Sequence, residues 1–260
     1  MPIVGIDAKK CNFCKACVKE CPLDNFSALK EERQITFNSS KDCILCGHCI
    51  VVCPKKAIIY KDMNENVIDF EAKIPSISTL ALNKLMLSKR SVRQYKNKNV
   101  PKEIIEKIIK SMSIAPVAMN KRSLKCIVIS GNKKINTLID SIIDSIEEVE
   151  DREEYKVKRE KGFDPFFFKA PHILILHSNN HWDTINGTIA ITYGMLYAET
   201  LGIGSCWIGG IQMFLNEKKE IKEKLLGIKD KICGFMIFGY PSVKYYRAPP
   251  RPPLATTFVT

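Results

Sequence analysis

The chain has 260 residues, of which 45% are hydrophobic and 26% charged, enough to build one or two domains with hydrophobic cores. Its formal net charge is +12, but basic and acidic residues are interspersed without an aromatic and basic stripe, so nucleic-acid binding is not indicated. Residues 184–216 contain one charged side chain, Glu199. Polar residues and the Gly202-Ile203-Gly204 break there predict a buried helix and a glycine-rich loop, not a membrane span.

Eight of the eleven cysteines form two copies of one motif, 32 residues apart when counted from Cys11 to Cys43. The copies are Cys11, Cys14, Cys17 and Cys21 before Pro22, and Cys43, Cys46, Cys49 and Cys53 before Pro54. Three closely spaced thiolates converge on one iron–sulfur cluster, and the fourth, before proline, ligates the other cluster. The pattern predicts two [4Fe-4S] clusters, one held by Cys11, Cys14, Cys17 and Cys53 and the other by Cys43, Cys46, Cys49 and Cys21.

Two other uses of these cysteines fit the pattern less well. Zinc sites show two C-x-x-C pairs separated by a longer loop. Disulfides suit exported proteins, but residues 1–10 contain no basic and apolar leader, so we expect a reducing, cytoplasmic compartment. With all eight thiolates present, His48 is predicted to be a surface residue or to lie just outside the ligand shell.

The sequence indicates two domains with a boundary near residue 75. We expect a two-cluster domain at residues 1–60, a linker at 61–78 and a second domain at 79–260. Residues 1–60 carry nine basic and six acidic side chains, and each bound cluster with its thiolates adds about −2, so the basic excess belongs mainly to the second domain. There it would either neutralise a bound phosphate and steer an acidic protein partner, or form a merely solvated basic surface.

Hydrophobic periodicity predicts alternating helices and strands in the second domain. The expected helices are Thr79–Ser88, Pro101 to about Ala115, Ile135–Ile146, Asn186–Leu201 and Asn216–Leu226, and the expected buried strands are Cys126–Ile129, Ile173–Leu176 and Ile232–Phe238. The charged stretch 147–161 and the aromatic residues up to Phe168 form either a mobile lid or, as we prefer, a solvated helix end with a hydrophobic anchor. Such alternation favours an α/β or α+β sandwich.

Three short segments of the second domain could together bind an anion and an aromatic ring. Arg90-Ser91-x-Arg93 offers two guanidinium groups and a hydroxyl for phosphate oxygens. Gly202–Gly210 supplies glycines where the backbone could approach a ligand closely. Arg251 lies in a stiff, proline-rich tail.

Together and in this order, these segments resemble the nitroreductase family of flavin mononucleotide (FMN) enzymes. Residues 115–120 look like its A-P-S-x-x-N loop, 202–210 like its G-L-G-S-x-W-I-G-G loop, and Gly239-Tyr240-Pro241 extends a likeness that spans about residues 80–255. Residues 1–60 similarly resemble a bacterial two-cluster ferredoxin. The resemblance implies an α+β chain in which a small ferredoxin-like domain precedes an FMN-binding sandwich.

The resemblance also implies roles for individual residues. The implied FMN-binding residues are Arg90, Ser91, Arg93, Pro116, Val117, Ala118, Asn120, Ile208, Gly209, Gly210 and Arg251. The arginines and Ser91 would hold the phosphate and ribityl end, Asn120 the polar edge of the ring, and the Gly209-Gly210 backbone its N5 side. Arg122-Ser123 replaces the family's Q-P, which departs from the pattern.

The expected function is that of an FMN-dependent oxidoreductase. The resemblance implies a homodimer with flavin at the subunit interface, and planar acceptors such as nitroaromatics or quinones. Electrons would come from a low-potential donor such as ferredoxin or flavodoxin; NAD(P)H stays possible although no Rossmann fingerprint is present. The alternative is a non-enzymatic electron carrier or redox sensor. No catalytic acid or base is predicted, because Tyr193 and Cys206 are expected to be structural.

Overall fold

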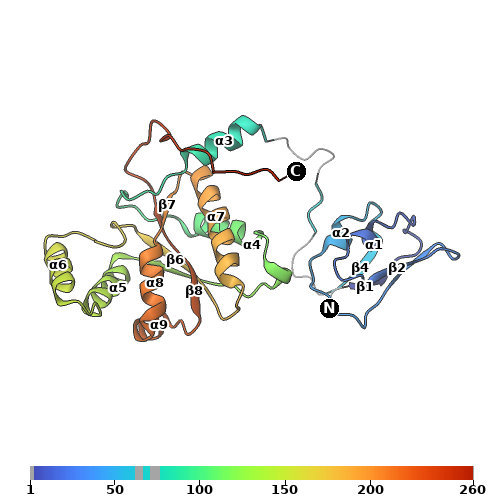
Figure 1. Cartoon of the computed structure of the whole chain (residues 1–260), viewed down its shortest axis with the longest axis horizontal. Helices are drawn as coiled ribbons and strands as arrows, with labels where there is room; N and C mark the ends of the chain where they lie inside the picture. Colours follow the sequence, from blue (N-terminus) through green and yellow to red (C-terminus); the bar gives the residue numbers. More distant parts are fainter. Residues whose placement is uncertain (1–2, 62–66, 71–76, 260) are drawn as a thin grey trace. The chain divides into compact units, whose positions relative to one another are not determined.

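The computed structural model describes residues 3–61, 67–70 and 77–259. The chain divides into two compact units (Figure 1): the first comprises Met1–Ser76 together with Ala118–Lys121, and the second comprises Ile77–Val117 and Arg122–Thr260. Most of the linker expected at 61–78 lies outside the described residues.

The first unit consists of two similar halves, each with a strand, a short helix and a second strand. Its elements are β1 (Ile3–Ile6), α1 (Ala16–Glu20), β2 (Phe26–Leu29), β3 (Gln34–Phe37), α2 (His48–Val51), β4 (Ile58–Tyr60) and the 3-10 turn η1 (Ala118–Asn120). Antiparallel pairs form between β1 and β4 and between β2 and β3. Because β3 repeats β1 and β4 repeats β2, each pair takes one strand from each half. The two cysteine motifs are therefore parts of one interlocked structure.

The backbone conformation follows the same repeat. Positive φ angles occur at Phe13 (57°) and Lys15 (61°) and, 32 residues later, at Leu45 (57°) and Gly47 (75°). Of these four, only Gly47 is a residue that adopts this conformation without steric cost. The left-handed residues turn each C-x-x-C-x-x-C loop sharply, and each loop then leads into a short helix.

The core of the first unit is small. It contains Ile3, Phe26, Ile35 and Ile58 together with two cysteines, Cys17 and Cys49, that are 8% and 7% exposed. A unit of this size buries little apolar surface, and such units commonly depend on metal centres for stability.

The second unit is built on a four-stranded sheet of order β5-β6-β8-β7. All three neighbouring pairs are antiparallel. The strands are β5 (Lys125–Ser130), β6 (His172–Ser178), β7 (Gly204–Trp207) and β8 (Lys231–Gly239). The helices are α3 (Thr79–Ser88), α4 (Lys102–Ser113), α5 (Asn132–Asp144), α6 (Val149–Glu160), α7 (Asp183–Thr200), α8 (Gly209–Glu217) and α9 (Lys219–Leu226). This architecture confirms the predicted α+β class.

Side chains alternate between two hydrophobic cores across the central strands. Ile173 and Ile175 of β6 pack into one core with α5 and α8, and Leu174 and Leu176 pack into the other with α4 and α7. Helices therefore cover both faces of the sheet (Figure 1).

Several predicted elements need correction. The strand at 126–129 is real but not buried: β5 is an edge strand, Cys126 is exposed, and only Ile129 among these four residues is buried. The single helix expected at 216–226 is two helices, α8 and α9, separated at Lys218. Within the expected glycine-rich loop lie β7 and the start of α8.

Two helical predictions also differ in detail. Pro101 precedes α4 as its N-cap and is not the first helical residue. The helix α7 is only partly buried, because Ile185, Tyr193 and Tyr197 are exposed on it. Within the described residues, no helix is both long and apolar enough to span a membrane.

The aromatic segment after α6 is an anchor. Phe167 is fully buried and stacks on Phe235 with ring centroids 5.7 Å apart. One Asp164 carboxylate oxygen accepts hydrogen bonds from the backbone nitrogens of Phe166 (3.1 Å) and Phe167 (2.8 Å). These contacts agree with the anchor interpretation and not with a mobile lid.

Candidate functional site

The eight motif cysteines line two separate cavities in the first unit. One cavity is lined by Cys11, Cys14, Cys17 and Cys53, here called the first cysteine set. The other is lined by Cys21, Cys43, Cys46 and Cys49, here called the second cysteine set. Each cavity thus contains three cysteines of one motif and the proline-preceding cysteine of the other. That each of these cysteines ligates iron stays a prediction.

The thiols of each set lie near enough to influence one another's ionisation. Burial raises the pKa of Cys17, and the neighbouring Cys53 and Cys11 raise it further. Burial raises the pKa of Cys49 to about 12, with added contributions from Cys46 and Cys43. Thiolates gathered in this way require a cationic centre to offset their mutual repulsion. The donor chemistry therefore fits an iron–sulfur cluster in each cavity.

The arrangement differs from that of a single-ion site. In the described part of the chain, no three His, Cys, Asp or Glu side chains are grouped so that they could hold one metal ion. The cysteines instead surround a cavity, which suits a cluster with several irons better than zinc.

Backbone N–H groups support both proline-preceding cysteines. The nitrogen of Asn25 lies 3.4 Å from Cys21 Sγ, and the nitrogen of Ala57 lies 3.3 Å from Cys53 Sγ. Hydrogen bonds to a thiolate favour its charged form. The two bonds are related by the 32-residue repeat, so both sets receive the same support.

Asn120 is placed in the first unit. Its side-chain nitrogen donates to the carbonyl oxygens of Ile44 (3.0 Å) and Leu45 (2.8 Å), between Cys43 and Cys46 of the second cysteine set. Ala118 belongs to the same unit, whereas the exposed Pro116 and half-buried Val117 belong to the second. A flavin-binding role for these residues stays a prediction.

The second unit joins two of the segments expected to bind flavin. Ser91 forms an isolated parallel bridge with Ser205 of β7, and the backbone nitrogen of Val92 donates to the Ser205 carbonyl at 3.1 Å. The side-chain nitrogen of Lys89 donates to the same carbonyl at 2.9 Å. The arginine motif is thereby held along the edge of β7.

Close packing explains one glycine of this arrangement. A Cβ atom on Gly204 would lie 2.7 Å from a methyl group of Val92, which is too close for real side chains. By contrast, a Cβ on Gly210 would meet no atom within 4 Å. Gly204 is therefore needed for the approach of the arginine motif, while Gly210 borders open space.

The polar groups beside β7 fit an anionic, flat ligand. Arg93 and Ser91 are exposed and Arg90 is half-buried. The helix α8 begins at Gly209 after Ile208, without a side-chain hydrogen bond capping its first N–H groups. Arginine side chains and uncapped helix N–H groups both favour negatively charged oxygens. FMN has such a phosphate, and these residues could hold it.

Not every predicted flavin residue is brought to this place. Arg251 is exposed and lies in the tail after β8, where residues 243–259 form no regular secondary structure. Among the described residues, no hydrogen bond or ion pair links it to the arginine motif. Lys89 was not predicted, although its position directly before Arg90 is a usable sequence signal.

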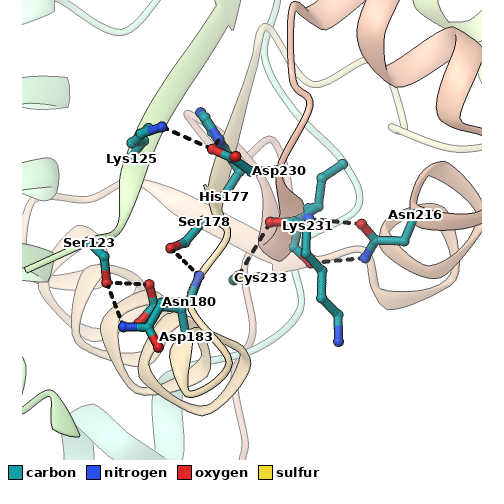
Figure 2. A network of polar contacts seen from close by, with 11 residues as sticks. Ser123, Lys125, His177, Ser178, Asn180, Asp183, Asn216, Asp230, Lys231 and Cys233 are labelled. Carbon is teal, nitrogen blue, oxygen red and sulfur yellow. Dashed lines mark hydrogen bonds and ion pairs between the residues drawn. The ribbon is translucent and has the colours of Figure 1, made fainter. Parts of the chain in front are cut away.

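The departure at Arg122-Ser123 has a structural explanation (Figure 2). The Ser123 hydroxyl donates to the carboxylate of the fully buried Asp183 at 2.6 Å. Asn186 donates to the other oxygen of this carboxylate at 2.8 Å. Asn180 donates to Ser123 at 3.1 Å. Ser123 therefore helps to satisfy a buried carboxylate at the start of α7.

A second polar cluster lies nearby in the same view (Figure 2). Asp230 accepts from Lys125 at 3.0 Å and lies 3.1 Å from His177 Nδ1. The hydrogen bond from Lys125 holds the pKa of Asp230 below its usual value. These contacts join the edge strand β5 to β6 and to the residue before β8.

The fold and these sites define an α+β oxidoreductase with an added iron–sulfur unit. The chain belongs to the nitroreductase family, because the family's model matches residues 86–240. The model of the 4Fe-4S dicluster domain matches residues 10–58. Both parts of the predicted resemblance are therefore confirmed, and the second domain is an oxidoreductase.

The relatives divide in the same way. A predicted NADH dehydrogenase/NAD(P)H nitroreductase of Methanothermobacter thermautotrophicus is 24% identical over 64% of this chain and 80% of its own length. A ferredoxin of Streptomyces griseus is 40% identical over 18% of this chain, which is 43% of the ferredoxin's length.

Solved structures share the fold of the second unit. A Bacteroides fragilis nitroreductase with bound FMN is 21% identical, with a TM-score of 0.56 and coverage of 69% of this chain and 98% of its own. A nitroreductase with bound FMN from Desulfitobacterium hafniense is 18% identical, with a TM-score of 0.54. The match covers 68% of this chain and 97% of the nitroreductase.

Proposed function

We propose that this chain is an iron–sulfur flavoprotein oxidoreductase. It would pass electrons from a low-potential donor through two [4Fe-4S] clusters to FMN and on to a planar organic acceptor, such as a nitroaromatic or a quinone. The observation that carries the proposal is the separation of eight cysteines into two four-cysteine cavities, in a chain that also contains a nitroreductase-family unit.

The bound groups would supply the redox chemistry: iron–sulfur clusters exchange single electrons, and a flavin exchanges one or two. The polypeptide's part is binding and electrostatics. The first cysteine set would hold one cluster and the second cysteine set the other. Arg90, Ser91 and Arg93 would bind the flavin phosphate and ribityl chain, and the N–H groups at Gly209 and Gly210 would contact the ring.

A relative named as an NAD(P)H nitroreductase supports NAD(P)H as a donor, and two structurally similar nitroreductases with bound FMN support FMN as the flavin. A ferredoxin or flavodoxin is the donor favoured by the cluster domain, because it exchanges single electrons. The thiolates need a reducing compartment, which supports a cytoplasmic location.

Exposed apolar side chains support a homodimer. No residue of α3 is buried, although the helix is largely apolar. Its side chains Leu80, Leu82, Met86 and Leu87 are between 44% and 62% exposed. On α7, which contacts α3, Tyr193 and Tyr197 are also exposed. Clustered apolar surface of this kind marks interaction sites. Sedimentation analysis of purified protein should give twice the chain mass of 29.5 kDa.

Anaerobic purification with iron, sulfide and flavin measured per chain tests the proposal. About eight irons, eight sulfides and one FMN are expected, because each [4Fe-4S] cluster contains four irons. Clusters without flavin would instead indicate an electron carrier or redox sensor, and four or fewer irons would contradict the two-cluster assignment.

A further inference from the structure

The charge of the first unit is unevenly divided between its two cysteine sets. The segments that carry the first set, residues 7–19 and 53–57, contain six lysines and one aspartate. The segments that carry the second set, residues 20–25 and 41–51, contain one lysine and three acidic residues. The formal charges of these segments are +5 and −2, so the two almost identical motifs are carried by segments of opposite net charge.

The six lysines of the segments that carry the first set are here called the lysine rim. Its members are Lys9, Lys10, Lys15, Lys19, Lys55 and Lys56. The backbone nitrogen of Asp7 donates to the carbonyl of Ala57 at 2.8 Å, and this bond joins the two segments that carry the rim. The rim therefore gathers around the first cysteine set, although its lysines are far apart in sequence.

The rim is largely available to solvent. All of its lysines except the half-buried Lys15 are exposed. Lys10 pairs with Asp7 and Lys56 with Asp69. The other four make no ion pair with any residue that the structure describes. Their positive charge is thus not cancelled within the described part of the unit.

The first cysteine set is also the more accessible one. Cys14 is exposed, whereas the second set consists of buried and half-buried cysteines. The loop between Cys43 and Cys46 is further engaged by Asn120 within the same unit. The exposed side chains near the second set include the apolar Leu45, within this loop, and Val51, at the end of α2.

We propose that the lysine rim is the docking surface for an acidic one-electron carrier protein. This inference rests on the proposed function and adds the location and the charge of the donor's contact. A bound cluster with four thiolates contributes about −2, so the surroundings of the first set stay positive when loaded. Positive patches attract acidic partners and raise their association rates at low salt.

The electron count is simple. Each encounter would oxidise one carrier by one electron, and two encounters would supply the two electrons for a two-electron reduction of the acceptor. The required protons would come from water. The carrier is defined by its chemistry: a protein with acidic groups around an exposed redox centre.

The test uses the holoenzyme and stopped-flow measurement of its reduction by an acidic two-cluster ferredoxin. The variant Lys9→Glu/Lys55→Glu reverses two exposed rim charges that do not line the cavity of the first cysteine set. Lys30→Glu/Arg33→Glu makes the same change of charge in the β2–β3 turn of the same unit and is the matched control. Reduction by the cationic methyl viologen radical checks that electron uptake itself is intact.

The rim variant should react with the ferredoxin at least about tenfold more slowly at low ionic strength. The difference should vanish near 1 M salt, where the screening length is about 3 Å. The control should keep the wild-type rate, and methyl viologen should reduce the rim variant at least as fast as the wild type.

Equal rates for rim variant and wild type, or equal losses in the control, would overturn the docking proposal. If the rim variant binds less iron, its rate cannot be compared, and the test then uses the wild type only. The rate at which ferredoxin reduces the wild type must fall as the salt concentration rises. Iron and flavin contents are measured on the same samples. If iron and flavin are fully bound but the rim substitutions do not change the reduction rate, only the docking surface is refuted. Missing clusters or flavin in the wild type would refute the proposed function.

Discussion

The backbone nitrogen of Val92 lies 3.1 Å from the carbonyl oxygen of Ser205 and donates a hydrogen bond to it. This bond joins the arginine motif to the glycine-containing segment that begins β7, two regions separated by more than a hundred residues. Any ligand held by one of them is therefore within reach of residues from the other, which leads to the first two predictions.

Replacing Arg90 and Arg93 together with alanine should remove flavin but not iron. The two guanidinium groups are the cationic side chains of the motif, and phosphate binding depends on such charges. Flavin and iron per chain would be measured after anaerobic purification. Lys133→Ala/Lys134→Ala removes two exposed charges on α5 and should retain both cofactors. Full flavin occupancy in the arginine variant would show that the phosphate is bound elsewhere.

Gly204→Ala should destabilise the second unit, because its new Cβ would lie 2.7 Å from Val92. Overpacking of this kind costs about 1–3 kcal/mol. Urea unfolding of flavin-free protein gives the free energy. Gly210→Ala is the control, because its Cβ meets no atom within 4 Å, and it should show no loss. Similar behaviour of the two variants would contradict the close approach of the motif to β7.

Pairs of cysteine substitutions should reveal which residues share a cluster. Cys17→Ser/Cys53→Ser removes two ligands of the first set and should leave about half of the iron, since the second set is intact. Cys17→Ser/Cys21→Ser removes one ligand from each set and should reduce iron much further. Iron content and electron paramagnetic resonance after reduction distinguish them. The reverse order of iron loss would mean that each motif holds its own cluster.

Ser123→Ala should destabilise the chain by about 1–3 kcal/mol, because Asp183 is fully buried and would lose one of its hydrogen-bond donors. Chemical denaturation measures the loss. Ser113→Ala is a suitable comparison, since that hydroxyl donates to the Lys110 carbonyl at an exposed site, and its effect should stay within about 0.5 kcal/mol. A harmless Ser123→Ala would mean that water or a rearrangement satisfies Asp183.

His172 should make the folded state sensitive to acid. Its Nε2 accepts from the backbone nitrogen of Val100 at 2.9 Å and its Nδ1 lies 2.7 Å from the Ser130 hydroxyl, so the ring is neutral. Burial lowers the pKa of His172 below its ordinary value of 6.5. Below about pH 6.5, His172 binds a proton in the unfolded chain but not in the folded chain. The free energy of unfolding therefore falls as the pH falls.

The measurement compares unfolding free energies of the wild type and His172→Gln between about pH 7 and pH 5, a range set by the ordinary histidine pKa. The wild type should lose stability more steeply, by at most about 1.4 kcal/mol per pH unit. Parallel curves for the two proteins would show that His172 does not contribute to the pH dependence.

The sequence by itself determined the features that depend on local spacing. The two cysteine motifs, the stripes of isoleucine in α4 and α5, and the apolar runs of β6 and β8 follow from periods that one segment contains within itself. The order of the segments that resemble the nitroreductase family is also visible in the sequence, without knowledge of where these segments meet in space. These predictions concern residues whose neighbours in space are also close in sequence.

Only the tertiary structure decided which distant segments meet. The edge position of β5 left Cys126 exposed although its run is apolar, because burial of a strand depends on what packs beside it. The engagement of Asn120 with Ile44 and Leu45 and the bond from Ser123 to Asp183 likewise depend on partners far along the chain. Such contacts are chosen by the packing of the whole unit, which no local pattern encodes.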